Sequence, residues 1–160
     1  MSNLDILAAV DALQVKYIRA LDRHDMQGWL NCFAAEEAAY LCMSAENEQQ
    51  GLPIATMMDD SRERLIDRVK FVTQVWEGTF DDYMTRHFVQ RLDCAPNDDG
   101  SYSVESNFLV TYTTANRRSG ILASGTYLDC VRLEAGQAVF RSKKALLDTI
   151  TTPRYLVYPI

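Results

Sequence analysis

The chain has 160 residues, of which 48% are hydrophobic and 24% are charged. This balance is typical of a folded globular protein and excludes a disordered or collagen-like chain. We expect one domain over residues 1–160, with a core large enough to need no metal or disulfide support. The net charge of −6 argues against a nucleic-acid partner, because few basic groups are available to neutralise phosphates.

The sequence carries no membrane or export signal. No apolar run approaches the roughly 20 residues that span a bilayer. The first residues lack the basic and apolar segments of a signal peptide. We therefore expect a cytoplasmic protein without a membrane partner.

Metal-binding residues are few and scattered. The two histidines are His24 and His87, and no two of the four cysteines form a Cys-x-x-Cys motif. Zinc and iron–sulfur sites need clustered thiolates or imidazoles. We expect free, mostly buried thiols and no metal or cofactor site in this chain. The cysteines are Cys32, Cys42, Cys94 and Cys130.

Helices are predicted for most of the first half. Apolar residues recur at steps of three and four from Ile6 to Leu21, and again from Met26 to Phe33. A short strand is expected at 38–43 and a loop at 44–53. A third helix should start after Ser61 and end at Gly78. Its predicted buried face consists of Leu65, Ile66, Val69, Val72, Val75 and Trp76.

The second half changes to the alternating pattern of β-strands. Four strands are predicted at Thr85–Asp93, Tyr102–Thr114, Ile121–Leu133 and Ala138–Thr149. The short connections between them have turn chemistry and suit antiparallel hairpins. Strands this long must curl. The predicted fold is therefore α+β, with the N-terminal helices packed inside a strongly curved antiparallel sheet that forms a half-open cone.

Two features suggest contacts with other chains. Arg141, Lys143 and Lys144 place three charges on an otherwise apolar strand. They face solvent, line a polar cavity of the cone, or form pairs across a subunit interface. The apolar tail at 155–160 would promote aggregation if it were exposed on a monomer. We therefore expect this tail to take part in assembly.

Three residues could support acid–base catalysis at the mouth of the cone. Tyr17, Asp22 and His87 are of the types that such a site uses. The structural alternative makes Tyr17 a core residue of its helix, Asp22 a helix-end residue and His87 a hydrogen-bonded strand residue. The sequence favours this alternative, so no catalytic residue is expected.

Several short motifs follow one another along nearly the whole chain. They are Tyr17-x-x-x-Leu21-Asp22, Trp29, Phe33, Tyr40, Asp60-x-Arg62-x-x-Leu65-x-x-Arg68-Val69, Arg86-His87, Ser106-Asn107-Phe108-Leu109-Val110, Gly125-x-Tyr127-x-Asp129 and Lys143-Lys144-Ala145-Leu146-Leu147-Asp148. Individually these motifs are unspecific, whereas their order is more informative. The ordered set resembles the small (β) subunits of Rieske-type aromatic-ring-hydroxylating oxygenases.

The resemblance implies a cystatin-like or NTF2-like cone without its own activity. Such a subunit associates with copies of itself and with a large (α) subunit, commonly as three of each. The large subunit holds a Rieske [2Fe–2S] cluster and a mononuclear non-haem iron, and it receives NAD(P)H electrons through a reductase and a ferredoxin. Within that family we expect a salicylate 5-hydroxylase, which converts salicylate to gentisate.

Two other classes of function remain open. A free-standing dehydratase, isomerase or cyclase would use Tyr17, Asp22 and His87 in the same cone. A small-ligand binding protein would use the cavity without chemistry. An enzyme should turn over without partners and lose activity when His87 is replaced, whereas a structural subunit should be inactive alone.

Overall fold

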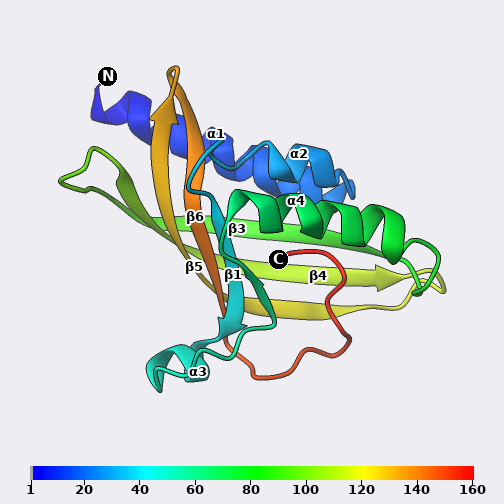
Figure 1. The fold of residues 1–160 in the computed structure, drawn as a ribbon. Helices are drawn as coiled ribbons and strands as arrows, with labels where there is room; N and C mark the ends of the chain where they lie inside the picture. Colours follow the sequence, from blue (N-terminus) through cyan, green and yellow to red (C-terminus); the bar gives the residue numbers. More distant parts are fainter. Residues whose placement is uncertain (1) are drawn as a thin grey trace.

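The computed structural model describes residues 2–160 and shows helices packed against one face of a curved sheet (Figure 1). The helices are α1 (Asn3–Asp22), α2 (Met26–Leu30), α3 (Ala45–Gln49) and α4 (Arg62–Lys70), and α4 continues into the π-helical turn η1 (Phe71–Val75). The strands are β1 (Ala39–Ser44), β2 (Met57–Asp59), β3 (Tyr83–Pro96), β4 (Tyr102–Thr114), β5 (Ser119–Glu134) and β6 (Gln137–Leu147). The predicted α+β class is confirmed.

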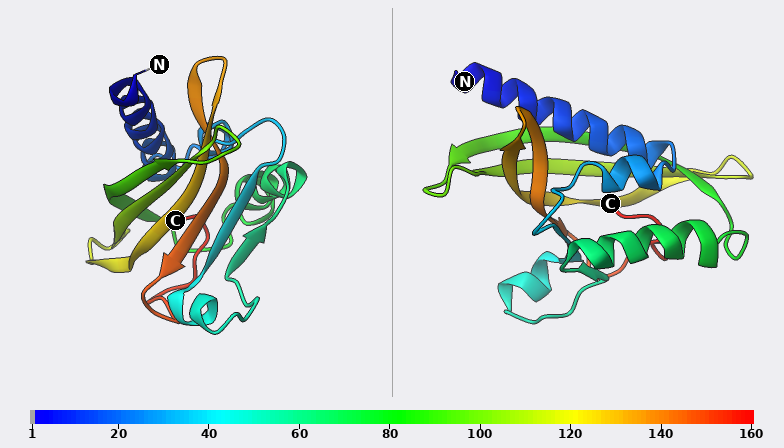
Figure 2. Two further views of the ribbon diagram at one scale, coloured as in Figure 1. Left: turned by 90° about the vertical axis from the view of Figure 1, so that its left-hand side faces the viewer. Right: turned by 45° about the horizontal axis from the view of Figure 1, so that its top comes forward.

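The strands form one six-stranded sheet in the order β2-β1-β6-β5-β4-β3. The predicted antiparallel hairpins are confirmed for β3 through β6. β1 is the exception, because it runs parallel to β6 with Ala39 opposite Ser142. Figure 2 shows the sheet curving around the C-terminal segment, which lies between the sheet and the helices.

The first and third predicted helices form largely as expected. The side chain of Ser2 accepts a hydrogen bond from the backbone N–H of Asp5 and caps α1. Ser61 caps α4 in the same way, and Gly78, with a φ of +71°, follows the helical segment. The predicted burial of Ile66 and Val75 is wrong, since they are 37% and 55% exposed. The π-helical turn shifts the spacing on which the prediction of Val75 depended.

The predicted loop at 44–53 contains the short helix α3. The Ser44 hydroxyl accepts a hydrogen bond from the backbone N–H of Asn47, and acidic residues occupy the first turn. β2, which has only three residues, was also missed. Both elements are shorter than the windows in which periodicity can be recognised.

Gly125 allows β5 and β6 to approach each other closely at the bend of the sheet. A Cβ atom at this position would lie 1.9 Å from the carbonyl oxygen of Leu146 and 3.0 Å from the Phe108 ring. Only glycine fits such a backbone contact. Among residues 2–160, no helix combines the length and apolar character needed to cross a membrane.

Candidate functional site

The structure brings Asp22 and His87 together inside the cone. Asp22 is the last residue of α1, and His87 lies on the inner face of β3. Nδ1 of His87 is 2.6 Å from Oδ1 of Asp22, while the His87 backbone N–H donates to Oδ2 at 3.2 Å. The Thr85 hydroxyl donates to Oδ1 at 3.0 Å. Asp22 therefore ties the end of α1 to β3 by three contacts.

The surroundings of this pair keep Asp22 ionised. Burial acts to raise the pKa of the Asp22 carboxyl, but the hydrogen bonds and charge of His87 bring the pKa below its ordinary value. The His87 side chain is only 1% exposed. Neither His87 nor Tyr17 lines any of five hollows of about 300 to 680 Å³ formed by residues 2–160. Asp22 lines none of them either, so the Asp22–His87 pair is separated from these hollows.

Tyr17 does not join the pair. Its hydroxyl donates to the backbone carbonyl of Ile160 at 2.7 Å. The Tyr40 hydroxyl donates to the same carbonyl at 3.0 Å and accepts from the Ile160 N–H at 2.9 Å. Burial raises the pKa of both tyrosines well above the ordinary value. The structural interpretation of Tyr17 as a buried core residue is therefore confirmed.

Residues 155–160 fold back into the cone, so the tail is not the exposed apolar segment that would promote aggregation of a monomer. Leu156, Val157 and Ile160 are all buried, whereas Tyr155 is 67% exposed. The Val157 N–H donates to the Tyr83 hydroxyl at 3.3 Å. The tail covers most of its apolar residues within the same chain, so its composition alone does not argue for assembly, and its part in assembly stays a prediction.

A second buried charge pair lies across β5 and β6. Nζ of Lys143 is 2.8 Å from Oδ2 of Asp129, and both side chains are 0% exposed. The Gln14 side-chain amide of α1 donates to the same carboxylate oxygen at 2.8 Å. Lys143 Nζ also lies 3.7 Å from the centroid of the Tyr127 ring. Burial raises the pKa of Asp129 and lowers that of Lys143, so desolvation opposes both charges.

Two of the three explanations, solvent and a subunit interface, are therefore wrong for Lys143, which is buried inside the cone. Its side chain points inward because it alternates with Lys144, which points outward and pairs with Glu48 at 2.7 Å. Arg141 pairs within the chain with Asp99 at 2.7 Å and Glu37 at 3.2 Å. The signal that could have predicted this pair is that Asp129 and Lys143 are opposite each other on β5 and β6, so both side chains point to the same face of the sheet.

The possible metal ligands stay apart. His24 stacks on Tyr158 at 4.1 Å and lies 3.8 Å from Asp82. Within residues 2–160, no three His, Cys, Asp or Glu side chains gather as metal ligands would. Burial raises the pKa of Cys32 to about 11 and that of Cys42 to about 12, which keeps these two thiols protonated.

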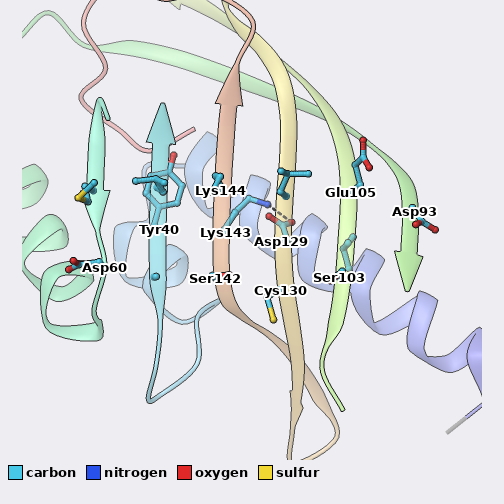
Figure 3. A pocket seen from close by; sticks show the side chains of 15 residues that line it. Tyr40, Asp60, Asp93, Ser103, Glu105, Asp129, Cys130, Ser142, Lys143 and Lys144 are labelled. Carbon is cyan, nitrogen blue, oxygen red and sulfur yellow. Dashed lines mark hydrogen bonds and ion pairs between the residues drawn. The ribbon is translucent and has the colours of Figure 1, made fainter. Parts of the chain in front are cut away.

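The outer face of the sheet carries the hollow of about 680 Å³ (Figure 3). Its lining includes three apolar side chains from separate strands, Leu41, Met58 and Leu128. Asp93 and Glu105 lie at one side, on the neighbouring strands β3 and β4. In Figure 3, α1 is behind the sheet, and the ion pair between Lys143 and Asp129 joins β6 to β5. Sequence reasoning did not anticipate this hollow.

Comparison with known proteins identifies the family. Residues 17–154 match the family model described as ring hydroxylating beta subunit. The small subunit of anthranilate 1,2-dioxygenase from Burkholderia cepacia is 28% identical, with 92% of this chain and 90% of that protein covered. The β2 subunit of the terminal oxygenase component of terephthalate 1,2-dioxygenase from Comamonas sp. is 21% identical, with 94% and 96% covered.

Solved structures agree with this result. A protein from Novosphingobium aromaticivorans assigned as the β subunit of an aromatic-ring-hydroxylating dioxygenase has a TM-score of 0.79 and 26% identity, with 90% of each chain covered. A protein from the same species assigned as a scytalone dehydratase has a TM-score of 0.70 at 19% identity, covering 96% of this chain and 92% of that one, and it shares the fold alone. The chain belongs to the family of ring-hydroxylating β subunits.

Proposed function

We propose that this chain is the structural, non-catalytic small subunit of a Rieske non-haem iron oxygenase that hydroxylates an aromatic acid such as salicylate. It acts as one domain over residues 1–160 and assembles with copies of itself and with a large subunit, three of each. Membership of the β-subunit family supports the assembly. The names of the relatives, which act on anthranilate and terephthalate, support an aromatic acid as the substrate class.

The observation that carries the non-catalytic role is that the interior charges are paired with one another, while Nε2 of His87 and Oδ1 of Asp129 are buried without a hydrogen-bond partner among residues 2–160. Asp22 pairs with His87, and Asp129 pairs with Lys143, at 2.6 and 2.8 Å. The tail at 155–160 fills the space beside Tyr17 and Tyr40. A general acid or base must reach a substrate proton directly or through one water. Asp22 and His87 line none of the five hollows. Asp129 and Lys143 belong to the lining of the hollow of about 680 Å³, but both side chains are 0% exposed and held by each other.

The residues of this chain do not fit a Rieske cluster. Such a cluster needs two cysteines and two histidines around one pair of irons. Nδ1 of His87 is held by Asp22, and His24 stacks on Tyr158. Cys32 lies in the turn after α2 and Cys42 lies in β1, and burial raises the pKa of both thiols. The chemistry of the oxygenase therefore belongs to the large subunit, and we propose a cytoplasmic assembly because free thiols suit a reducing compartment.

The role of His87 is the sharpest test. The His87→Gln variant retains some hydrogen bonding but removes proton transfer near neutral pH. We expect the oxygenase reconstituted with this variant and its large subunit to keep its turnover within a few-fold. A loss on the order of a hundredfold or more, at unchanged assembly and iron content, would assign catalysis to the small subunit.

A second experiment tests the division of labour between the subunits. Elemental analysis of the chain purified alone should find far less than one iron per chain. Turnover should appear only after the large subunit, the reductase and the ferredoxin are added, with salicylate giving gentisate. Turnover by the isolated chain would instead favour the dehydratase or isomerase alternative. Stoichiometric binding of an aromatic acid by the isolated chain, without turnover, would favour the ligand-binding alternative.

A further inference from the structure

The outer hollow combines an apolar centre with two carboxylates that the chain leaves without ionic partners. Met58 and Leu128 are 40% and 39% exposed where the hollow opens. Beside them, Asp93 and Glu105 are directly opposite each other in the register of β3 and β4. Like charges directly opposite on neighbouring strands destabilise a sheet. The arrangement therefore costs the isolated chain stability.

Other charges around the hollow are compensated within the chain, which makes these two carboxylates exceptional. Asp60 pairs with Arg64 at 3.3 Å, and Lys144 pairs with Glu48 at 2.7 Å. Among the ion pairs of residues 2–160, none includes Asp93 or Glu105. A β-bulge between Arg91 and Asp93 sets the position of Asp93 in the β3–β4 register. The geometry presents two negative charges together beside an apolar hollow.

We propose that this hollow docks a segment of the large oxygenase subunit that presents an apolar side chain next to an arginine or lysine. The proposal rests on the function proposed above. The apolar side chain would cover Leu41, Met58 and Leu128, while the basic group would lie between Asp93 and Glu105. An arginine suits such a site because its planar guanidinium can donate to two carboxylates at once.

Charge complementarity selects this occupant over two others. A second copy of this chain brings a net charge of −6 to a rim that is already negative. An aromatic acid brings a carboxylate to the same rim and is repelled for the same reason. A basic segment gains from both carboxylates and relieves the repulsion between them. Binding of a basic group would therefore turn the repulsion between Asp93 and Glu105 into a net attraction for the partner.

The first test reverses one charge at the hollow and one elsewhere. Glu105→Lys is compared with Asp81→Lys, which makes the same change in net charge at an exposed residue near the opposite end of β3. Both variants and the wild type are titrated against the large subunit by calorimetry, and each small subunit is melted alone. Glu105→Lys should weaken binding at least tenfold with a melting temperature equal to or above that of the wild type, because lysine now faces Asp93. Asp81→Lys should bind like the wild type.

The second test changes the apolar centre. Leu128→Gln should weaken the same binding at least fivefold. The matched control is Ile121→Gln on the same strand, because Ile121 is 61% exposed and does not line the hollow. This control should leave binding unchanged. The pair separates loss of apolar contact at the hollow from a general effect of polar substitutions on β5.

The outcomes distinguish this proposal from the proposed function. If Glu105→Lys and Leu128→Gln bind the large subunit as strongly as the wild type does, the docking site is overturned and the proposed function still stands. A wild type that does not bind the large subunit overturns both. Variants that retain large-subunit binding but lose self-association, as measured by sedimentation, would assign the hollow to a second copy and overturn the proposed occupant.

Discussion

The inner face of the sheet carries a pair of opposite charges, whereas the outer face carries a pair of like charges. Inside the cone, Asp129 and Lys143 are opposite each other and form an ion pair with both side chains 0% exposed. Outside, Asp93 and Glu105 are opposite each other with the same sign of charge. The inner pair costs desolvation, but its two charges neutralise each other within the chain. The outer carboxylates have no ionic partner within residues 2–160. The inner pair therefore stabilises the fold, whereas we propose that the outer carboxylates bind the large subunit.

The largest effect should come from breaking the inner pair. Asp129→Leu leaves the Lys143 ammonium buried without its carboxylate, and we expect a loss of about 3–5 kcal/mol in the free energy of unfolding. The double variant Asp129→Leu with Lys143→Met should recover most of this loss, because no charge then remains buried. Urea denaturation of both variants measures the difference. A double variant as unstable as the single one would show that the charges are not the cause.

The next effect concerns the tail that fills the cone. Ile160 is 0% exposed, and its backbone is bound by Tyr17 and Tyr40. Ile160→Ala should lower the free energy of unfolding by about 2–5 kcal/mol through the cavity it leaves. Ile150→Ala is the control, because Ile150 is 64% exposed and its truncation should change stability by less than about 0.5 kcal/mol. Equal losses would place the tail outside the core in solution.

Asp22 should link stability to acid. Its pKa is lowered in the folded chain, although burial acts the other way. The ionised Asp22 carboxylate therefore stabilises the folded chain fully at pH values above its ordinary pKa of about 4. This contribution is lost as the pH falls through the lower pKa of the folded chain. Asp22→Asn should cost about 1–3 kcal/mol at pH 7.

The pH dependence supplies the control for Asp22. Urea midpoints measured between pH 6 and pH 3 should fall less steeply for Asp22→Asn than for the wild type. Parallel pH profiles for the two proteins would contradict a structural role for the ionised carboxylate.

The smallest effect, and the opposite sign, is expected on the outer face. Asp93→Asn removes the repulsion with Glu105 and should raise the free energy of unfolding by about 0.2–1 kcal/mol at pH 7. Urea denaturation of Asp93→Asn and of the wild type at pH 7 measures it. Destabilisation at pH 7 would show that Asp93 already has a compensating partner in the isolated chain.

The fold was predictable where hydrophobic periodicity extends over many residues. β4 was predicted with the bounds that the structure shows, Tyr102–Thr114, because its alternation runs through thirteen residues. α3 and β2 were missed because a capped turn of five residues and a strand of three carry no such pattern. The parallel pairing of β1 with β6 was not predicted either, since nothing local in the two strands specifies it.

The candidate site was predictable only in part. The sequence named Asp22 and His87, which lie 65 positions apart, but their contact depends on how α1 crosses β3. Lys143 was assigned to solvent, a polar cavity or an interface because charged residues are rarely buried. Its inward direction follows from the register with Asp129, which becomes visible only when the strands are paired. The outer hollow likewise exists only after distant strands meet.

The parallel pairing of β1 with β6 also determines when the sheet can form during synthesis of the chain. β1 starts at Ala39, and its partner Ser142 on β6 is synthesised about a hundred residues later. At about 5–20 residues per second, the edge of β1 waits some 5–20 seconds on the ribosome before its partner strand exists. Long-range pairing of this kind slows folding. Nascent chains halted before β6 therefore present an open strand edge, which is a template for pairing with another chain.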